Sequence, residues 1–288
     1  MPTVFVLIWS TGFIVARYGM PHAPPLTFLT WRYALSVLCF GVWIALSRAA
    51  WPRDARQWAH LCVTGMLMHA GYLGGVWAAV KAGMGAGTIA LLVGLQPVLT
   101  AIWLSGSQRG RGAQRVSGRQ WAGLLLGLLG LVLVVWDKLG AGELSALNLS
   151  LAMFALLSIT VGTLYQKRFV APCDVRTANM VQLLAALAVS APLALLEAES
   201  VVLHPHFVGA LAWSVFGLTL GGSSLLYLLI QRGAATKVTS LLYLVPPTTA
   251  VMAWLLFDEA MTSLMMAGMA LTAMGVWLVA RTEGKPEA

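Results

Sequence analysis

Residues 71–101 read GYLGGVWAAVKAGMGAGTIALLVGLQPVLTA, and residues 221–251 read GGSSLLYLLIQRGAATKVTSLLYLVPPTTAV. The two stretches are 150 residues apart, and at this offset glycines, a leucine pair and a proline coincide. The coinciding positions are Gly71 with Gly221, Gly83 with Gly233, Leu91-Leu92 with Leu241-Leu242 and Pro97 with Pro247. An offset of 145 aligns Gly130 with Gly275 near the two ends of the repeat. Self-similarity at a fixed spacing indicates an internal duplication.

The composition indicates that most of the chain lies in lipid. Of the 288 residues, 59% are hydrophobic and only 10% are charged, whereas soluble domains carry about 25% charged residues. A membrane-spanning helix needs about 20 apolar residues, so the chain has room for ten spans and short loops. We expect spans at Thr3–Tyr18, Leu26–Ser47, Trp58–Val80, Ala86–Ser105, Arg119–Trp136, Leu147–Arg168, Val175–Leu196, Phe207–Gln231, Val238–Phe257 and Ser263–Ala280.

The duplication and the span count together predict the architecture. Each half, residues 1–138 and residues 146–283, holds five spans, and an odd number reverses the second half in the membrane. We therefore predict an all-α polytopic membrane protein of ten transmembrane helices, built as two inverted five-helix repeats. Such repeats support alternating access, with a small-molecule site near the midplane between the halves.

The basic residues predict the orientation. With the N-terminus in the cytoplasm, 14 of the 18 Lys and Arg residues fall on the cytoplasmic side, and Arg17, Lys81 and Lys138 fall outside. This bias follows the positive-inside rule, so we expect a bacterial-type inner membrane, with both termini cytoplasmic. The net charge of +8 then marks inside loops and does not predict a nucleic-acid partner. The first span has no basic segment before it, and we do not expect it to be a signal peptide.

Three stretches carry a family resemblance. They are WSTGF at residues 9–13, TIALLVGLQPV at residues 88–98, and YLVPP at residues 243–247 running on to Phe257-Asp258-Glu259. They resemble the EamA-type members of the drug/metabolite transporter superfamily over essentially the whole chain. The resemblance implies ten helices, cytoplasmic termini, and export or exchange of small metabolites such as amino acids. The chain departs from the family at Gln108-Arg109, where the fourth helix often ends in a Glu-containing turn.

The candidate site residues are aromatic and polar side chains in helices that we expect to face the central axis. They are Ser10, Trp77, Gln96, Tyr165, Ser223, Ser224, Tyr227, Ser240 and Tyr243. Gln182 is a further polar candidate for the lining of the same cavity. A mostly apolar cavity with a few polar groups suits a bulky, partly apolar solute, although each aromatic has packing as its alternative role. Amino acids, including aromatic ones, are the expected substrate class.

Two titratable side chains lie well inside the expected spans, Arg32 and His69. A charge in a span is costly, so Arg32 is a candidate for substrate contact or gating, with pairing to backbone carbonyls as the alternative. His69 is a candidate for proton coupling, with a packing role as the alternative. Pro97 and Pro247 are expected in mid-helix at equivalent places, where each removes a backbone hydrogen bond and forms either a hinge or a static kink.

All ten acidic residues lie in loops or at helix ends. A carboxylate relay is therefore not expected, and transport is either facilitated diffusion or coupled through another group. His204 and His206 flank Pro205 in an outside loop and make a poor metal site alone, and we expect no metal and no cofactor. The spacings Gly71–Gly75 and Gly123–Gly127 predict close helix packing within the chain.

Other function classes stay open as alternatives. An intramembrane enzyme would need a nucleophile with a base or a metal cluster, and no GxSxG, no HExxH and no paired acids occur within the expected spans. A channel would need a ring of charges or a carbonyl filter, for which the sequence has no signature. A different metabolite or drug remains an alternative substrate. The oligomeric state is left open between monomer and homodimer.

Overall fold

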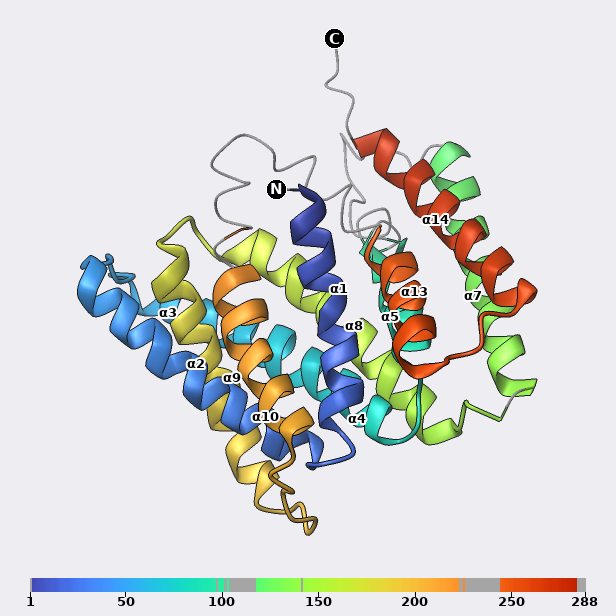
Figure 1. Cartoon of the computed structure of the whole chain (residues 1–288). Helices are drawn as coiled ribbons and strands as arrows, with labels where there is room; N and C mark the ends of the chain where they lie inside the picture. The colour runs from blue at the N-terminus through green and yellow to red at the C-terminus, as the bar shows by residue number, and fades with distance from the viewer. Residues whose placement is uncertain are drawn as a thin grey trace.

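The computed structural model describes residues 2–96, 98–100, 103, 118–140, 142–222, 225 and 244–283, and every regular element in these ranges is a helix (Figure 1). The helices are α1 Pro2–Gly19, α2 Pro25–Ser47, α3 Ala55–Gly65, η1 Met66–Gly71, α4 Tyr72–Lys81, α5 Ala86–Val93, α7 Gly118–Gly140, α8 Ala146–Phe169, α9 Val175–Ala194, α10 Pro205–Ala212, η2 Trp213–Gly222, α13 Val245–Phe257 and α14 Ser263–Glu283. The segments η1 and η2 are π-helical.

These helices make up the ten spans expected from the sequence, because α3, η1 and α4 form one rod and α10 and η2 form another. Five rods are long and apolar enough to cross a membrane by length and composition: Pro25–Ser47, Ala55–Lys81, Trp121–Gly140, Ala146–Phe169 and Val175–Ala194. Shorter apolar helices follow within the described residues, at Val6–Gly19, Ala86–Thr100, Val245–Phe257 and Ser263–Gly275.

The helix boundaries repeat at the offset seen in the sequence. Helix α2 begins at Pro25 and α9 at Val175, and α3 begins at Ala55 and α10 at Pro205. Each pair is 150 residues apart. The π-helical segments also correspond, because η1, shifted by 150 residues, falls within η2. The chain is therefore a duplication whose halves fold alike, as predicted.

Local capping explains why several helices begin where they do. Asp54 and Asp174 precede α3 and α9, and each carboxylate accepts the backbone N–H two residues on. Ser145 and Asn148 form a reciprocal capping box at the start of α8. A side chain that accepts a free amide of the first turn satisfies a donor that no helical carbonyl can reach.

The two halves pack through equivalent helices (Figure 1). Helix α2 packs on α9, α5 on α13, and α7 on α14, so each equivalent pair lies across the pseudo-twofold axis. Glycines also allow close packing of other helices of the two halves, because a methyl group placed on Gly75 of α4 would lie 2.9 Å from the Cβ of Ala155 in α8. Gly123 and Gly127 likewise face Gly275 of α14. Both glycine spacings therefore serve packing within the chain, as predicted.

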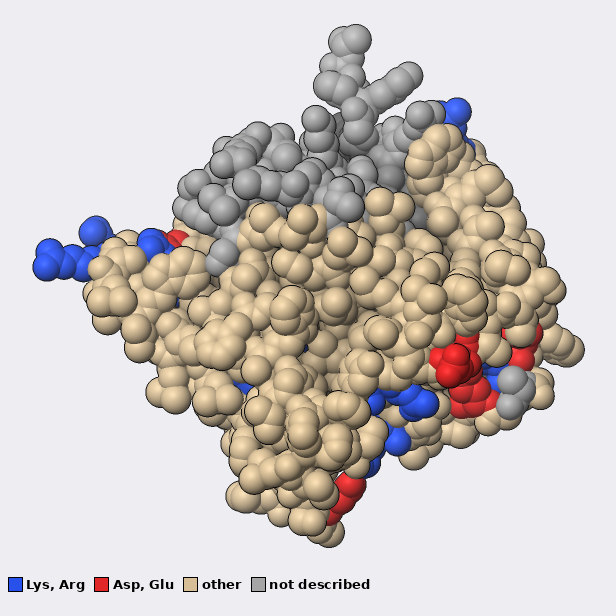
Figure 2. Space-filling model, in the orientation of Figure 1, with Lys and Arg blue, Asp and Glu red and all other residues tan. Residues whose placement is uncertain are grey.

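The outer surface is apolar. Helix α7 exposes Leu125, Leu128 and Trp136, and α2 exposes Leu38 and Leu46. Figure 2 shows a broad band without Lys, Arg, Asp or Glu on this face, with charged side chains gathered at its edges. Large exposed apolar side chains are stable in lipid and costly in water, so this surface is that of a multi-pass membrane protein.

Candidate substrate site

The two π-helical segments lie at equivalent points of the halves. A π-helical turn displaces backbone carbonyls from their usual partners, and such turns are frequent at functional sites. In η2 the Thr219 hydroxyl donates to the Ser214 carbonyl at 2.8 Å, five residues back. Residue 219 corresponds to His69 of η1 at the 150-residue offset. Both side chains lie near a polar residue of a neighbouring helix.

Arg32 of α2 reaches Thr219 in the other half. Its Nε and Nη2 donate to the Thr219 hydroxyl at 3.3 and 3.2 Å. The side chain is only 7% exposed, and its remaining nitrogen, Nη1, is buried without a hydrogen-bond partner among the described residues. A buried guanidinium with an unsatisfied donor is costly unless an acceptor arrives. The arrangement therefore leaves one charged donor available for an anionic ligand.

A second polar pair is related to the first by the repeat. Gln182 of α9 corresponds to Arg32, and its side chain lies near the ring of His69, which corresponds to Thr219. Each pair thus joins the second helix of one half to the third helix of the other half. The pairs differ in chemistry, because only the Arg32 pair carries a fixed positive charge. We call Arg32, Thr219, His69 and Gln182 the central polar layer.

Aromatic side chains surround the Arg32 side of this layer. The guanidinium carbon lies 5.5 Å from the centroid of the Trp77 ring, and Trp77 is 2% exposed. The Tyr33 hydroxyl donates to the backbone carbonyl of His69 at 2.9 Å. An arginine over an indole face gains a cation–π attraction that grows as water is excluded. The layer combines one cation, polar groups and aromatic faces.

Ser10 of α1 lies apart from the central polar layer and contacts the first turns of α13. Its hydroxyl donates to the Val245 carbonyl at 3.4 Å, and the Thr249 hydroxyl donates to the Ser10 carbonyl at 3.2 Å. Pro247 lies in the first turn of α13, so its expected mid-helix position is wrong. A proline in a first turn removes no helical hydrogen bond, because the amides there have no partner within the helix. Its hinge role stays a prediction.

The helix equivalent to α13 is interrupted at the matching place. Helix α5 ends at Val93, Gly94 and Leu95 form a turn, and helical conformation resumes at Gln96. Position 94 corresponds to Leu244, the turn residue before α13. A methyl group placed on Gly94 would lie 2.7 Å from Pro246, so this turn contacts the first turn of α13. An interrupted helix at the contact between two inverted repeats is typical of transporter substrate sites.

Two other candidates bind polar partners on neighbouring helices. The Gln96 amide donates to the Thr163 hydroxyl at 2.8 Å, and the Tyr165 hydroxyl lies 2.8 Å from Nδ1 of His60. Gln96 and Tyr165 are half-buried and do not contact the central polar layer through any described hydrogen bond. Five further candidates and one proline lie outside the described residues: Ser223, Ser224, Tyr227, Ser240, Tyr243 and Pro97.

The loops on one face connect the halves through carboxylates. Glu197 accepts from the amides of Leu26 and Thr27, at the start of α2. Glu259 accepts from the amides of Ala86 and Gly87, at the start of α5. A carboxylate at a helix N-terminus binds free amides and the positive end of the helix dipole. These contacts hold this face closed between the halves.

Glu143 strengthens the same face. Partial burial favours its neutral form, but hydrogen bonds from Lys138, Thr88 and the Gly85 amide, with the Lys138 charge, hold its pKa below the usual value. The Lys138 ammonium lies 2.7 Å from the carboxylate and is 3% exposed. The ion pair is therefore present at neutral pH.

Comparison with known proteins identifies the family. The sequence profile of the EamA-like transporter family matches residues 3–136 and again residues 147–281. The chain belongs to the EamA-like transporter family. It is a transporter and not an enzyme, and its two matched segments fall on the two structural halves.

Curated relatives of this EamA-like transporter are distant. The chain is 24% identical over 283 residues to a probable amino-acid metabolite efflux pump of Escherichia coli (strain K12), covering 95% of this chain and 91% of that protein. It is 25% identical to the uncharacterized transporter YvbV of Bacillus subtilis (strain 168), with 95% and 88% covered. A solved structure titled only "Crystal structure of protein" shares the fold, with a TM-score of 0.65 and 17% sequence identity. The match covers 99% of this chain and 97% of the other.

The sequence indicated Gln182 as a polar residue of the cavity, but it did not assign Thr219 to the site of this EamA-like transporter. Thr219 is a neutral polar residue in a span, which a composition pattern does not separate from packing residues. The repeat carries the missing signal, because residues 32 and 69 shifted by 150 are residues 182 and 219. The partner of Arg32, Thr219, is the repeat-equivalent of His69. The neighbour of His69, Gln182, is the repeat-equivalent of Arg32.

Proposed function

We propose that the protein is a secondary transporter of the bacterial inner membrane that moves amino acids, aromatic ones included, by alternating access. The supporting observation is the central polar layer, in which Arg32 crosses from the first half to Thr219 in the second. A carboxylate is common to all amino acids, and the buried Nη1 of Arg32 is a donor of matching charge. The efflux-pump names of two relatives agree with this class.

The aromatic surroundings support a bulky side chain on the substrate. Trp77 and Tyr33 lie next to Arg32, and planar rings contact other planar rings and apolar groups favourably. In the structure Arg32 is covered, so a substrate reaches it when residues 1–138 and 146–283 move apart on one side of the membrane. Movement of two related halves around one fixed site is the general scheme for inverted repeats.

The transport experiment uses purified protein in liposomes and a panel of labelled amino acids, with and without a proton gradient. Uptake that saturates, shows counterflow and ignores the gradient supports facilitated transport by a carrier. Accumulation driven by the gradient supports coupling through His69 or another group. Flux that does not saturate and lacks counterflow supports a channel, and flux of no amino acid contradicts the substrate class.

Cytoplasmic termini are part of the proposal and need a separate test. We expect a cysteine at Pro21 to react with an impermeant thiol reagent on intact cells. We expect a cysteine at Arg53 to react only after permeabilisation. Both positions are exposed in loops, and the background protein would have Cys39, Cys62 and Cys173 replaced. The opposite labelling pattern would contradict the orientation.

A further inference from the structure

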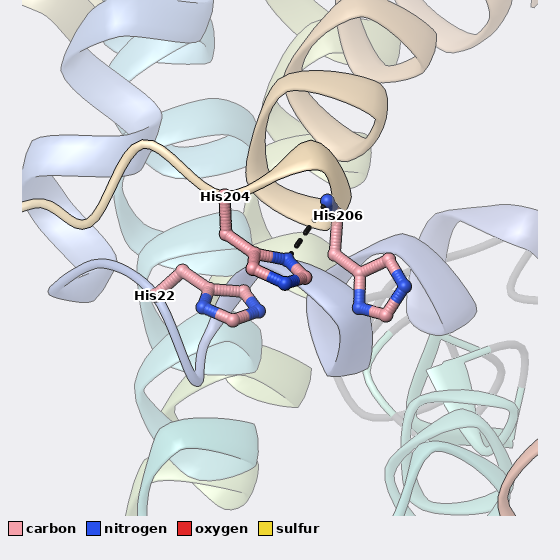
Figure 3. A group of neighbouring side chains, drawn as sticks. All are labelled: His22, His204 and His206. Carbon is pink, nitrogen blue, oxygen red and sulfur yellow. Dashed lines mark hydrogen bonds between the residues drawn. The ribbon is translucent and has the colours of Figure 1, made fainter.

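Three histidines from the two halves meet at the loop face (Figure 3). His22 lies between α1 and α2, and His204 and His206 lie at the start of α10. The rings of His22 and His204 stack with centroids 4.2 Å apart, and those of His204 and His206 are 4.7 Å apart. The Val202 amide donates to the His22 carbonyl at 2.8 Å, which fixes one loop against the other. The group joins residues 182 positions apart.

The spacing of the ring nitrogens suits a transition metal ion. One nitrogen of each ring lies within 4.8 Å of one nitrogen of both other rings. Three imidazoles on a tetrahedral Zn²⁺ at 2.0–2.1 Å hold their nitrogens about 3.4 Å apart, so metal binding requires these rings to rotate out of the stacked arrangement and their nitrogens to approach one another. Imidazole is a ligand that Zn²⁺, Cu²⁺ and Ni²⁺ prefer, and three of them leave one position for water.

Capping alone does not account for His204. Its Nδ1 accepts the His206 N–H at 3.1 Å, as Asp54 accepts the N–H of Arg56 at the equivalent start of α3. Aspartate is a preferred residue at this position and histidine is not. The equivalent half therefore caps the same helix start with a side chain better suited to the task. The three-histidine group is not repeated at the equivalent positions of the other half, which hold Asp54, Arg56 and Pro172.

The electrostatic surroundings permit a cation. The Lys81 ammonium, which donates to the Met20 carbonyl at 2.9 Å, is a positive charge near His22. A neutral imidazole has a free lone pair, which metal binding requires. The Lys81 ammonium is itself paired with Glu199 at 2.6 Å, which offsets its repulsion of a metal ion.

We propose that His22, His204 and His206 form a binding site for one Zn²⁺ ion that joins the two halves on the loop face. If the metal takes the Nδ1 of His204, it replaces the cap of α10. If it takes the other nitrogen, the ring must change tautomer and lose the same cap. Metal binding therefore exchanges one hydrogen bond at the start of α10 for a metal–nitrogen bond. The sequence shows two of these ligands as His-Pro-His, and the fold adds the third.

The proposed site has a consequence for transport, which rests on the proposed function. A metal held by both halves prevents them from separating on this face, and alternating access requires that separation. We expect micromolar Zn²⁺ to inhibit transport by the wild-type protein. Substitution of a ligand would relieve the inhibition and leave transport without metal unchanged, because none of the three histidines lies in the central polar layer.

Calorimetric titration of the purified full-length protein with ZnCl₂ tests the site directly, after removal of any purification tag and of bound metal by a chelator. We expect one equivalent to bind the wild type. We expect His22→Ala and His206→Ala each to weaken binding at least about 10- to 100-fold, the loss seen even for indirect metal partners. His60→Ala is the matched control, because His60 pairs with Tyr165 on other helices and should leave binding unchanged.

The outcomes separate binding from transport. Absence of binding by the wild type, or equal binding by the wild type, His22→Ala and His206→Ala, overturns the site. Loss of binding in His60→Ala as well overturns it too, because the metal would then bind elsewhere. Binding that depends on His22 and His206, together with transport unaffected by Zn²⁺, supports the site and overturns its role as a clamp. A protein that binds the metal but moves no amino acid contradicts only the proposed substrate class.

Discussion

Replacement of Arg32 by glutamine tests whether the central polar layer recognises a carboxylate. Arg32→Gln keeps a polar side chain near Thr219 and removes the charge. The Nε and Nη2 atoms already bind Thr219, so the substrate gains one charge-assisted bond from Nη1. Such a bond contributes about 1.5–3 kcal/mol. At about 1.4 kcal/mol for each tenfold change, the affinity should fall about 10- to 150-fold.

The assay compares an amino acid with its decarboxylated amine as ligands of the purified protein. Ligand-induced thermal stabilisation reports both affinities, because a ligand that binds only the folded state raises the melting temperature. We expect Arg32→Gln to weaken the amino acid by this factor and to change the amine about threefold or less, roughly 0.6 kcal/mol. Arg32→Lys should fall in between, because lysine keeps the charge and loses the planar fork.

A loss of equal size for the amino acid and the amine would refute the reasoning. It would mean that Arg32 supports the fold of the layer and does not read the carboxylate. A melting temperature of the ligand-free variant close to that of the wild type is the control for folding. An unchanged affinity for the amino acid would place the carboxylate elsewhere.

Three further perturbations test the packing and the loop face. Gly75→Ala should destabilise the protein by about 1–3 kcal/mol in thermal unfolding, because its methyl group would meet α8 at 2.9 Å. Gly74→Ala is the control and should cost under about 1 kcal/mol, because its methyl group would have its nearest contact at 3.7 Å. Equal losses of stability in the two variants would contradict this packing. Glu143→Gln should lower the free energy of unfolding by about 1–3 kcal/mol at pH 7. Because the folded pKa of Glu143 is lowered, its stabilisation is fully present above the unfolded value of 4.5 and is lost as the pH falls through the folded pKa. The difference in unfolding free energy between wild type and variant should therefore narrow at acidic pH, and a constant difference would count against the ion pair. Glu259→Ala should cost about 1–2 kcal/mol and speed hydrogen exchange at the Ala86 amide, and unchanged exchange would exclude the cap.

The repeat shows what an amino-acid pattern can predict in a membrane protein. Apolar runs of span length and a 150-residue offset predicted the spans, and the structure places the starts of α2 and α9, Pro25 and Val175, at that offset. Arg32 and His69 stood out because charge and imidazole are rare in lipid. Pro247 did not follow the prediction, because the sequence does not show that a turn at Leu244 precedes α13.

The sequence by itself determined that most of the chain lies in lipid, how many spans it has and that it is duplicated, because these properties depend on composition and spacing along the chain. Only the tertiary structure decided which residues meet across the halves. Arg32 and Thr219 are 187 residues apart, and His22 and His204 are 182 apart. Helical periodicity shows which face of a helix is apolar, but not which helix lies against it. The central polar layer and the histidine group therefore emerge only when the inverted halves are packed together.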